Sequence, residues 1–201
     1  MKKLIAMAAA LLLSAGAYAQ HEVGSVTIQP KVGMNIASMT DLGDGDGTRI
    51  GLAFGAEAEY QFTDMFSLSA GLLYSTQGAT QEGIEEGIPV DVTIQTDYLN
   101  IPIMVNCYVV KGLAVKLGIQ PGFNVKGKYK AEAAGVELKG DLEDLGFKPK
   151  TMDFSIPVGI SYEFANIQLD ARYNWGLTKA VSHTDSKHSV FQITLGYKFE
   201  L

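Results

Sequence analysis

The stretch RIGLAFGAEAEYQF, residues 49–62, alternates between two kinds of side chain with a period of two. One face is apolar and uncharged, whereas the other carries Arg49, Glu57 and Glu59. Such a period is typical of an extended strand that meets a different environment on each side. The same alternation recurs along the chain and predicts eight strands, at about 26–38, 49–62, 66–77, 97–108, 113–126, 152–164, 167–177 and 190–201.

The first 19 residues have the pattern of a secretion signal. Two lysines precede an apolar run at 4–13, and the A-x-A motif at 17–19 predicts cleavage between Ala19 and Gln20. The mature residues, 20–201, fit a single domain. No later run is long and apolar enough to cross a bilayer as a helix, so strands of about a dozen residues are the predicted membrane-crossing elements.

Charge and cysteine content narrow the function classes. The formal net charge is −6, and cleavage after Ala19 would remove two lysines and leave the chain more acidic. An acidic chain in which we find no basic cluster argues against a nucleic-acid partner. The lone cysteine, Cys107, cannot form an internal disulfide bond and falls on the apolar face of its predicted strand.

Three features predict that the apolar faces point towards lipid. Glycines of the strands lie on the polar face, where a narrow barrel leaves little room. Bulky aromatic residues lie on the apolar face and gather near strand ends, as in the girdles of outer-membrane barrels. Short turns alternate with long connections, which puts both termini on the periplasmic side and leaves four external loops, near 39–48, 78–96, 127–151 and 178–189.

Barrel closure and four prolines add further expectations. An unpaired strand edge is costly in hydrocarbon, so the first predicted strand must pair with the last. Pro102 and Pro157 lie within two strands, and Pro30 and Pro121 within two others. Because proline donates no ladder hydrogen bond, a bulge is expected at Pro102 and at Pro157, and the other two prolines raise the same problem.

Several segments are similar to those of one family of bacterial proteins. The signal peptide, SAGLLYSTQG at 69–78, YLNIP at 98–102 and LGYKF at 195–199 resemble the outer-membrane β-barrel family of Bacteroidetes, often labelled "porin family" or PorT-type. The resemblance extends over essentially the whole mature chain. It implies an eight-stranded, OmpA/OmpX-like barrel in the outer membrane of a Gram-negative bacterium, and it carries no catalytic motif to transfer.

The polar faces bring charged residues of both signs into the predicted lumen. One interpretation is a hydrophilic channel, and the other is a plug of paired charges that fills a narrow barrel. The plug is favoured, because eight-stranded barrels are generally filled by side chains and open porins have about 16 to 18 strands. The predicted lumen charges are Lys31, Arg49, Glu57, Glu59, Lys116, Lys126, Glu163, Asp170, Arg172 and Lys198.

The external loops offer a candidate cation site with a weak pattern. In the first loop, Asp41, Asp44 and Asp46 alternate with glycine, but the EF-hand spacing fails, so a flexible acidic turn without a metal is predicted. The segment 131–138 fits either a strand extension or a short helix. The loops are acidic to mixed in charge, and a solvated surface is favoured over one bridged to lipopolysaccharide by divalent cations.

The fourth loop groups residue types that could act in catalysis, namely His183, Asp185, Ser186 and His188. Serine, histidine and a carboxylate are the groups that a lipid hydrolase uses. These four are nearly consecutive, however, and the G-x-S-x-G elbow is missing, so no catalytic site and no cofactor are predicted. His21, at the mature N-terminus, is expected to be disordered.

The sequence therefore predicts an eight-stranded antiparallel up-and-down transmembrane β-barrel. We expect a monomer with a side-chain-filled lumen and with external loops that present a binding surface. Its expected partners are outer-membrane lipid, the barrel-assembly machinery during insertion and an unidentified ligand of the loops. Three alternatives are a narrow pore for small solutes, an outer-membrane lipid hydrolase using Ser186, and a soluble lipocalin-like barrel.

Overall fold

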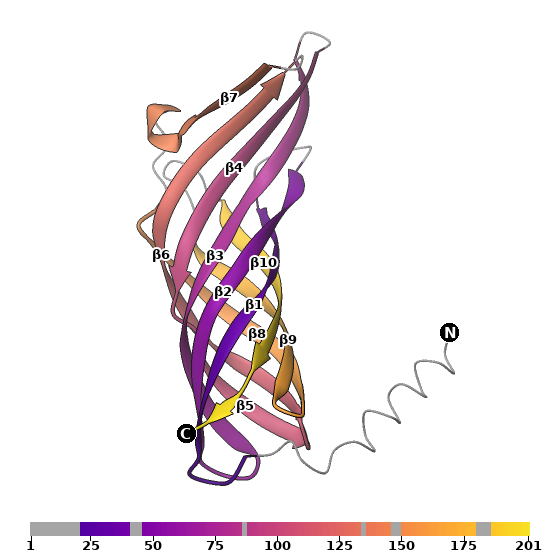
Figure 1. Cartoon of the computed structure of the whole chain (residues 1–201). Helices are drawn as coiled ribbons and strands as arrows, with labels where there is room; N and C mark the ends of the chain where they lie inside the picture. Colours follow the sequence, from indigo (N-terminus) through magenta and orange to yellow (C-terminus); the bar gives the residue numbers. More distant parts are fainter. Residues whose placement is uncertain (1–20, 41–45, 86–87, 134–135, 146–149, 180–185) are drawn as a thin grey trace, which may run out of the picture.

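The computed structural model describes residues 21–40, 46–85, 88–133, 136–145, 150–179 and 186–201 (Figure 1). Almost all of them lie in antiparallel strands of one sheet. The elements are β1 (Val26–Met39), β2 (Asp46–Gln61), β3 (Phe66–Glu85), β4 (Ile88–Asn100), β5 (Ile103–Val110), β6 (Leu113–Ala133), β7 (Val136–Asp141), the 3-10 turn η1 (Leu142–Leu145), β8 (Met152–Phe164), β9 (Ile167–Lys179), β10 (Lys187–Tyr197) and β11 (Phe199–Glu200). Within these residues no helix is long and apolar enough to cross a membrane.

Eight strands form the wall of the barrel. β4 and β5 make one strand interrupted at Ile101 and Pro102, because both pair with β3 in a single unshifted register. β10 and β11 likewise make one strand interrupted at Lys198, and both pair with β1. This last pairing joins the first strand to the last and closes the barrel, so the predicted eight-stranded antiparallel barrel is confirmed.

Side chains alternate between the lumen and the outer surface as the sequence predicts. Along β1, Thr27, Gln29 and Lys31 are buried, whereas Val32 and Met34 are exposed. Below the extended ends of β3, β4 and β6, the outward faces of the other strands are also apolar and exposed, and Trp175 is 63% accessible. A closed barrel that buries its polar side chains and exposes its apolar ones suits a lipid surrounding.

The prolines do not produce the expected bulges. β8 keeps one register with β9 through Pro157, and β1 does the same with β2 through Pro30. Pro121 remains in the ladder opposite Phe154. Pro102 interrupts its strand without shifting the register, and its carbonyl oxygen accepts a hydrogen bond from the Gly71 N–H (3.0 Å). A missing donor removes one hydrogen bond but inserts no residue, so the strands stay in step.

Two of the segments expected to be long external loops, 78–96 and 127–151, are largely strand over their described residues, which corrects that prediction. β3 and β4 form a continuous hairpin up to Glu85 and Ile88, and β6 pairs with β7 over Lys128–Ala133. Figure 1 shows β3, β4, β6 and β7 rising together beyond the ends of the remaining strands. Of the two predictions for 131–138, the strand extension is correct for the residues that the structure describes.

Candidate functional site

Five charged residues meet inside the barrel, and we call them the lumen cluster. They are Lys31 (β1), Glu57 (β2), Lys116 (β6), Asp170 and Arg172 (β9), and all five side chains are buried. The two carboxylates lie between the three cations, so each carboxylate contacts more than one of them. The sequence predicted all five as lumen residues, and the structure brings them together.

The contacts of the lumen cluster are short. Lys31 Nζ lies 2.7 Å from Glu57 Oε2 and 3.3 Å from Asp170 Oδ2. Lys116 Nζ lies 2.7 Å from Asp170 Oδ2 and 3.9 Å from Glu57 Oε2. Arg172 donates from Nη2 to Glu57 Oε1 (2.8 Å) and from Nε to Asp170 Oδ1 (2.9 Å). Charge-assisted bonds of this kind are what buried ions require.

Glycines beside these charged residues make room for them. Gly159 of β8 stands between Lys116 and Arg172 in the ladder, because it pairs with both. A Cβ on Gly159 would lie 2.6 Å from the Ala171 carbonyl oxygen and 2.8 Å from Arg172 Cβ. Glu57 is likewise paired with Gly71. The polar-face glycines therefore provide the space in which long charged side chains cross a narrow lumen.

A second group of charges lies nearer the periplasmic turns, and we call it the periplasmic cluster. Lys198 Nζ lies 2.9 Å from Glu59 Oε2 and 2.7 Å from Glu163 Oε2. Tyr108 donates its hydroxyl to Glu59 Oε1 (2.5 Å). This cluster has one more carboxylate than lysine, and the lumen cluster has one more cation than carboxylate. These eight side chains, five in the lumen cluster and Lys198, Glu59 and Glu163 here, balance in charge.

His21 belongs to the periplasmic cluster, so the prediction that it is disordered is wrong. Its Nε2 lies 3.0 Å from Glu163 Oε1, and its Nδ1 lies 3.4 Å from Glu200 Oε2. The hydrogen bond to Glu163 raises the pKa of His21, although burial acts in the opposite direction. The segment that precedes β1 is thereby held against β8 and β11.

Arg49 is a predicted lumen charge that takes no part in either cluster. It lies at the external end of β2 and is only half-buried. Its guanidinium donates to the backbone carbonyl oxygen of Gln77. No carboxylate of the described residues forms an ion pair with it.

Lys126 is the other exception, because its side chain is exposed rather than inside the lumen. The β4–β6 ladder shifts between Asp97, which pairs with Lys126, and Tyr98, which pairs with Asn124. Val125 is the extra residue of this bulge. One inserted residue reverses the face of every later side chain on β6, so the even-numbered residues point outward from Lys126 onwards.

The described members of the proposed hydrolase constellation do not face each other. Ser186 donates its hydroxyl to the Thr40 carbonyl oxygen (2.6 Å). His188 Nε2 instead lies 3.2 Å from the Tyr98 hydroxyl, with the two rings edge to face at 5.2 Å. His183 and Asp185 lie outside the described residues.

The acidic turn of the first loop falls on residues that are not described, except that Asp46 begins β2. The prediction of a flexible turn without a metal therefore stays a prediction. Among the residues that the structure describes, no three side chains of the metal-binding types converge.

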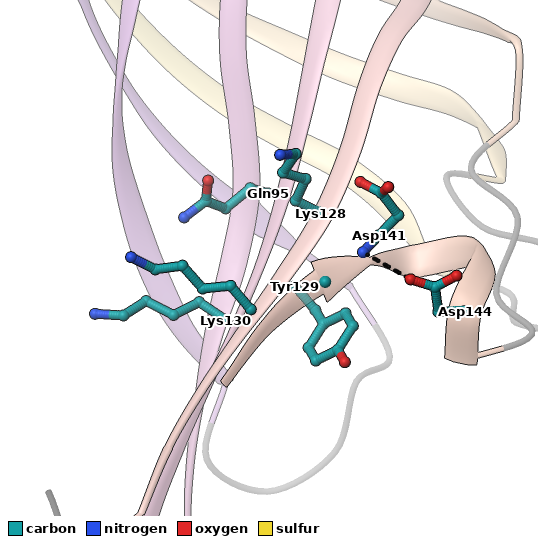
Figure 2. A pocket seen from close by; sticks show the side chains of 8 residues that line it. Gln95, Lys128, Tyr129, Lys130, Asp141 and Asp144 are labelled. Carbon is teal, nitrogen blue, oxygen red and sulfur yellow. Dashed lines mark hydrogen bonds between the residues drawn. The ribbon is translucent and has the colours of Figure 1, made fainter. Parts of the chain in front are cut away.

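A pocket of about 570 Å³ lies on the external strands, where the sequence predicted only a loop. It is lined by Gln95 (β4), by Lys128 and Lys130 (β6), and by Lys139 and Asp141 (β7), among others. Figure 2 shows the amines of Lys128 and Lys130 projecting from the strands while the Tyr129 ring turns another way. The sequence does carry a signal for these lysines, since Lys126, Lys128 and Lys130 continue the period of two.

The closed sheet, the apolar outer face and the paired lumen define the class of protein, an outer-membrane β-barrel. The profile of the family described as outer membrane protein beta-barrel domain matches residues 18–182, and the chain belongs to this family.

Two solved structures that resemble the chain are bacterial surface barrels. One is Ail, the attachment invasion locus protein of Yersinia pestis, which is 14% identical with a TM-score of 0.51 over 89% of this chain and 100% of Ail. The other is Neisserial surface protein A, which is 14% identical with a TM-score of 0.52 over 87% of this chain and 97% of that protein. At this identity the likeness concerns the fold alone. Among proteins of curated function, none matches the sequence.

Proposed function

We propose that this protein is a non-conducting, non-enzymatic scaffold of the outer membrane that presents its external strands as a binding surface. The observation that carries the proposal is the lumen cluster, in which five buried charges from β1, β2, β6 and β9 bridge the interior. A conducting path would have to separate these pairs in a low-dielectric interior, which is costly.

Buried neutral side chains add to this obstruction on the external side of the lumen cluster. Asn35 donates to Ser75 Oγ (2.9 Å), and Gln192 donates to Asn35 Oδ1 (2.8 Å). Nearer the external end, Tyr98 and His188 are almost fully buried. The function then resides on the external strands, which present the pocket between β4, β6 and β7.

Single-channel conductance of the refolded mature chain, 20–201, in a planar bilayer tests the proposal. In parallel, a difference in gel mobility between boiled and unboiled samples shows that the barrel is folded. A gel shift without stable conductance steps is the expected result. Stable steps from folded protein would instead support the alternative of a narrow pore and overturn the plug.

The finer assignments belong to the same proposal. We infer export by a signal peptide at 1–19 with cleavage between Ala19 and Gln20, and a monomer in the membrane. We also infer membership of the PorT-type group of Bacteroidetes, which rests on the segments 69–78, 98–102 and 195–199. N-terminal sequencing of protein purified from outer membranes checks the cleavage, and a mature start other than Gln20 would correct it.

A further inference from the structure

The bulge at Val125 turns a row of lysines to the outside of the molecule. Ile94 packs inward against Met39 and Ala79. Its chain neighbours Thr93 and Gln95 therefore point outward, because side chains alternate along a strand. The residues of β6 opposite these two neighbours are Lys130 and Lys128, which share the outward face with them.

Lys126 continues this row towards the membrane. It pairs with Asp97, whose carboxylate accepts a hydrogen bond from the hydroxyl of the outward-facing Tyr74 (2.8 Å). We call Lys126, Lys128 and Lys130 the lysine row. Lys139 of β7 stands directly opposite Lys130 and extends the positive charge sideways.

The lysine row begins where the apolar surface of β6 ends. Val115, Leu117, Ile119, Phe123 and Val125 are the exposed apolar side chains below it. A strand rises by about 3.3 Å per residue, so the tilted segment from the turn to Val125 spans a height comparable to an apolar band of about 25 Å. The lysine row therefore lies at the level of the outer-leaflet headgroups.

The lysines on this external face differ in their ion pairs. Lys126 and Lys128 form no ion pair with any described carboxylate. Lys130 lies 3.4 Å from Glu132 and 3.7 Å from Glu137, both nearer the tip of the hairpin. Asp97 and Asp141 stand opposite Lys126 and Lys128 in the ladder, so carboxylates also lie at the level of the row, but neither forms an ion pair with these two lysines.

The pocket at the row has room for a ligand and contains one lysine, Lys128, that forms no ion pair with a described carboxylate. Lys130 and Lys139 stand directly opposite each other, and the Glu137 carboxylate forms an ion pair with both of them. Asp144 is engaged with the backbone N–H of Asp141 (3.3 Å) and not with a lysine (Figure 2). Gln95 adds an amide donor beside Lys128.

We propose that the lysine row and its pocket bind the phosphate groups of an outer-leaflet glycolipid, lipopolysaccharide. Phosphate is the anion that the headgroup layer offers at this height, and lysines next to a membrane are attracted to anionic headgroups. Direct lysine contacts replace the bridging by divalent cations that acidic loops would need. The inference goes beyond the proposed function and does not depend on whether the lumen conducts.

Binding of fluorescent lipopolysaccharide to the mature barrel in neutral detergent micelles tests the proposal. The probe is used intact and after chemical removal of its phosphates. The variant Lys126→Gln/Lys128→Gln/Lys130→Gln is compared with Lys111→Gln/Lys150→Gln/Lys187→Gln, which changes the net charge equally at exposed lysines elsewhere. The gel shift confirms that each barrel is folded.

We expect the wild type to bind the phosphorylated probe about tenfold more tightly, or more, than the dephosphorylated one. The lysine-row variant should lose this preference, the control should keep it, and added salt should weaken it in the wild type. Equal binding of both probes by the wild type would overturn the proposal without requiring any variant. A lysine-row variant that keeps the preference for the phosphorylated probe would also overturn it. Competition by inorganic pyrophosphate at the same concentration as the glycolipid would do the same, since a free anion would then be the ligand.

Discussion

Arg172 Nη2 lies 2.8 Å from Glu57 Oε1, although the two residues are 115 positions apart in sequence and lie on β9 and β2. Both side chains are buried, and β2 and β9 are not adjacent in the sheet. The contact therefore spans the lumen rather than following the wall. It ties together two strands that β1 and β10 separate in the wall, and it makes the interior polar, paired and dense.

Replacement of Glu57 by glutamine should destabilise the barrel strongly. Glu57→Gln leaves Lys31 and Arg172 with one negative charge fewer, and loss of one partner of a buried pair costs about 3–5 kcal/mol. The free energy of unfolding, measured by denaturant titration with Trp175 fluorescence, checks this. Glu132→Gln, at an exposed position of β6, is the matched control and should change that free energy by less than about 0.5 kcal/mol. Similar values for both variants would contradict the role given to the lumen cluster.

Removal of both Asp170 and Arg172 should open a path for ions. Asp170→Ala/Arg172→Ala deletes one charge of each sign, so it widens the lumen without changing the net charge. We expect small conductance steps in planar bilayers from this variant and none from Lys130→Ala/Glu132→Ala, which removes an external pair. If the folded double variant shows no conductance steps, side chains other than Asp170 and Arg172 close the lumen.

Stability should depend on pH through His21. Its pKa in the folded protein is raised by the hydrogen bond to Glu163, so the protonated form is favoured on folding. The stabilisation is then fully present below about pH 6.5, the ordinary histidine value, and is lost as the pH rises through the raised pKa. The ring is only partly buried, so we expect less than about 1 kcal/mol.

Comparison of His21→Gln with the wild type at pH 5.5 and pH 8.5 isolates this contribution from that of other groups. The wild type should lose more unfolding free energy than the variant between the two pH values. An equal loss in both proteins would mean that the His21–Glu163 contact contributes nothing.

The glycine beside the lumen cluster should not accept a side chain. Gly159→Ala places a methyl group against the Ala171 carbonyl oxygen and Arg172 Cβ, and overpacking of this kind costs about 1–3 kcal/mol. Ala56→Val, on the exposed outer face of β2, adds volume where space is available and should be nearly neutral. The unfolding free energies of the two variants provide the comparison.

The period-two pattern predicted the strands and the direction of their faces because a half-buried strand must alternate. The structure buries eight of the ten predicted lumen charges and leaves Arg49 half-buried at the end of its strand. The pattern failed at Lys126, because a bulge leaves no mark in composition. Val125 is an ordinary apolar residue, and its insertion is visible only in the pairing of β4 with β6. The external hairpins were missed for a related reason, since polar strands above a membrane lack the apolar face that marks the others.

The ion-pair scheme of the lumen was also beyond the sequence. Lys31 is opposite Gly55 and Gly196 along the wall, so its partners Glu57 and Asp170 follow from barrel curvature and side-chain reach, not from strand pairing. His21 illustrates the same limit, because a terminal residue has no periodic pattern from which a contact can be inferred.

The single extra residue at Val125 separates β6 into two segments whose side chains can vary independently. Residues before it must suit the interior and the hydrocarbon, whereas the outward-facing residues after it meet water and headgroups. A deletion at this position would send Lys126 and the lysines beyond it towards the axis of the barrel and turn Tyr129 outward. Which side chains the external sheet presents is thus decided by the number of residues in the strand. The identity of any single residue in it does not decide this.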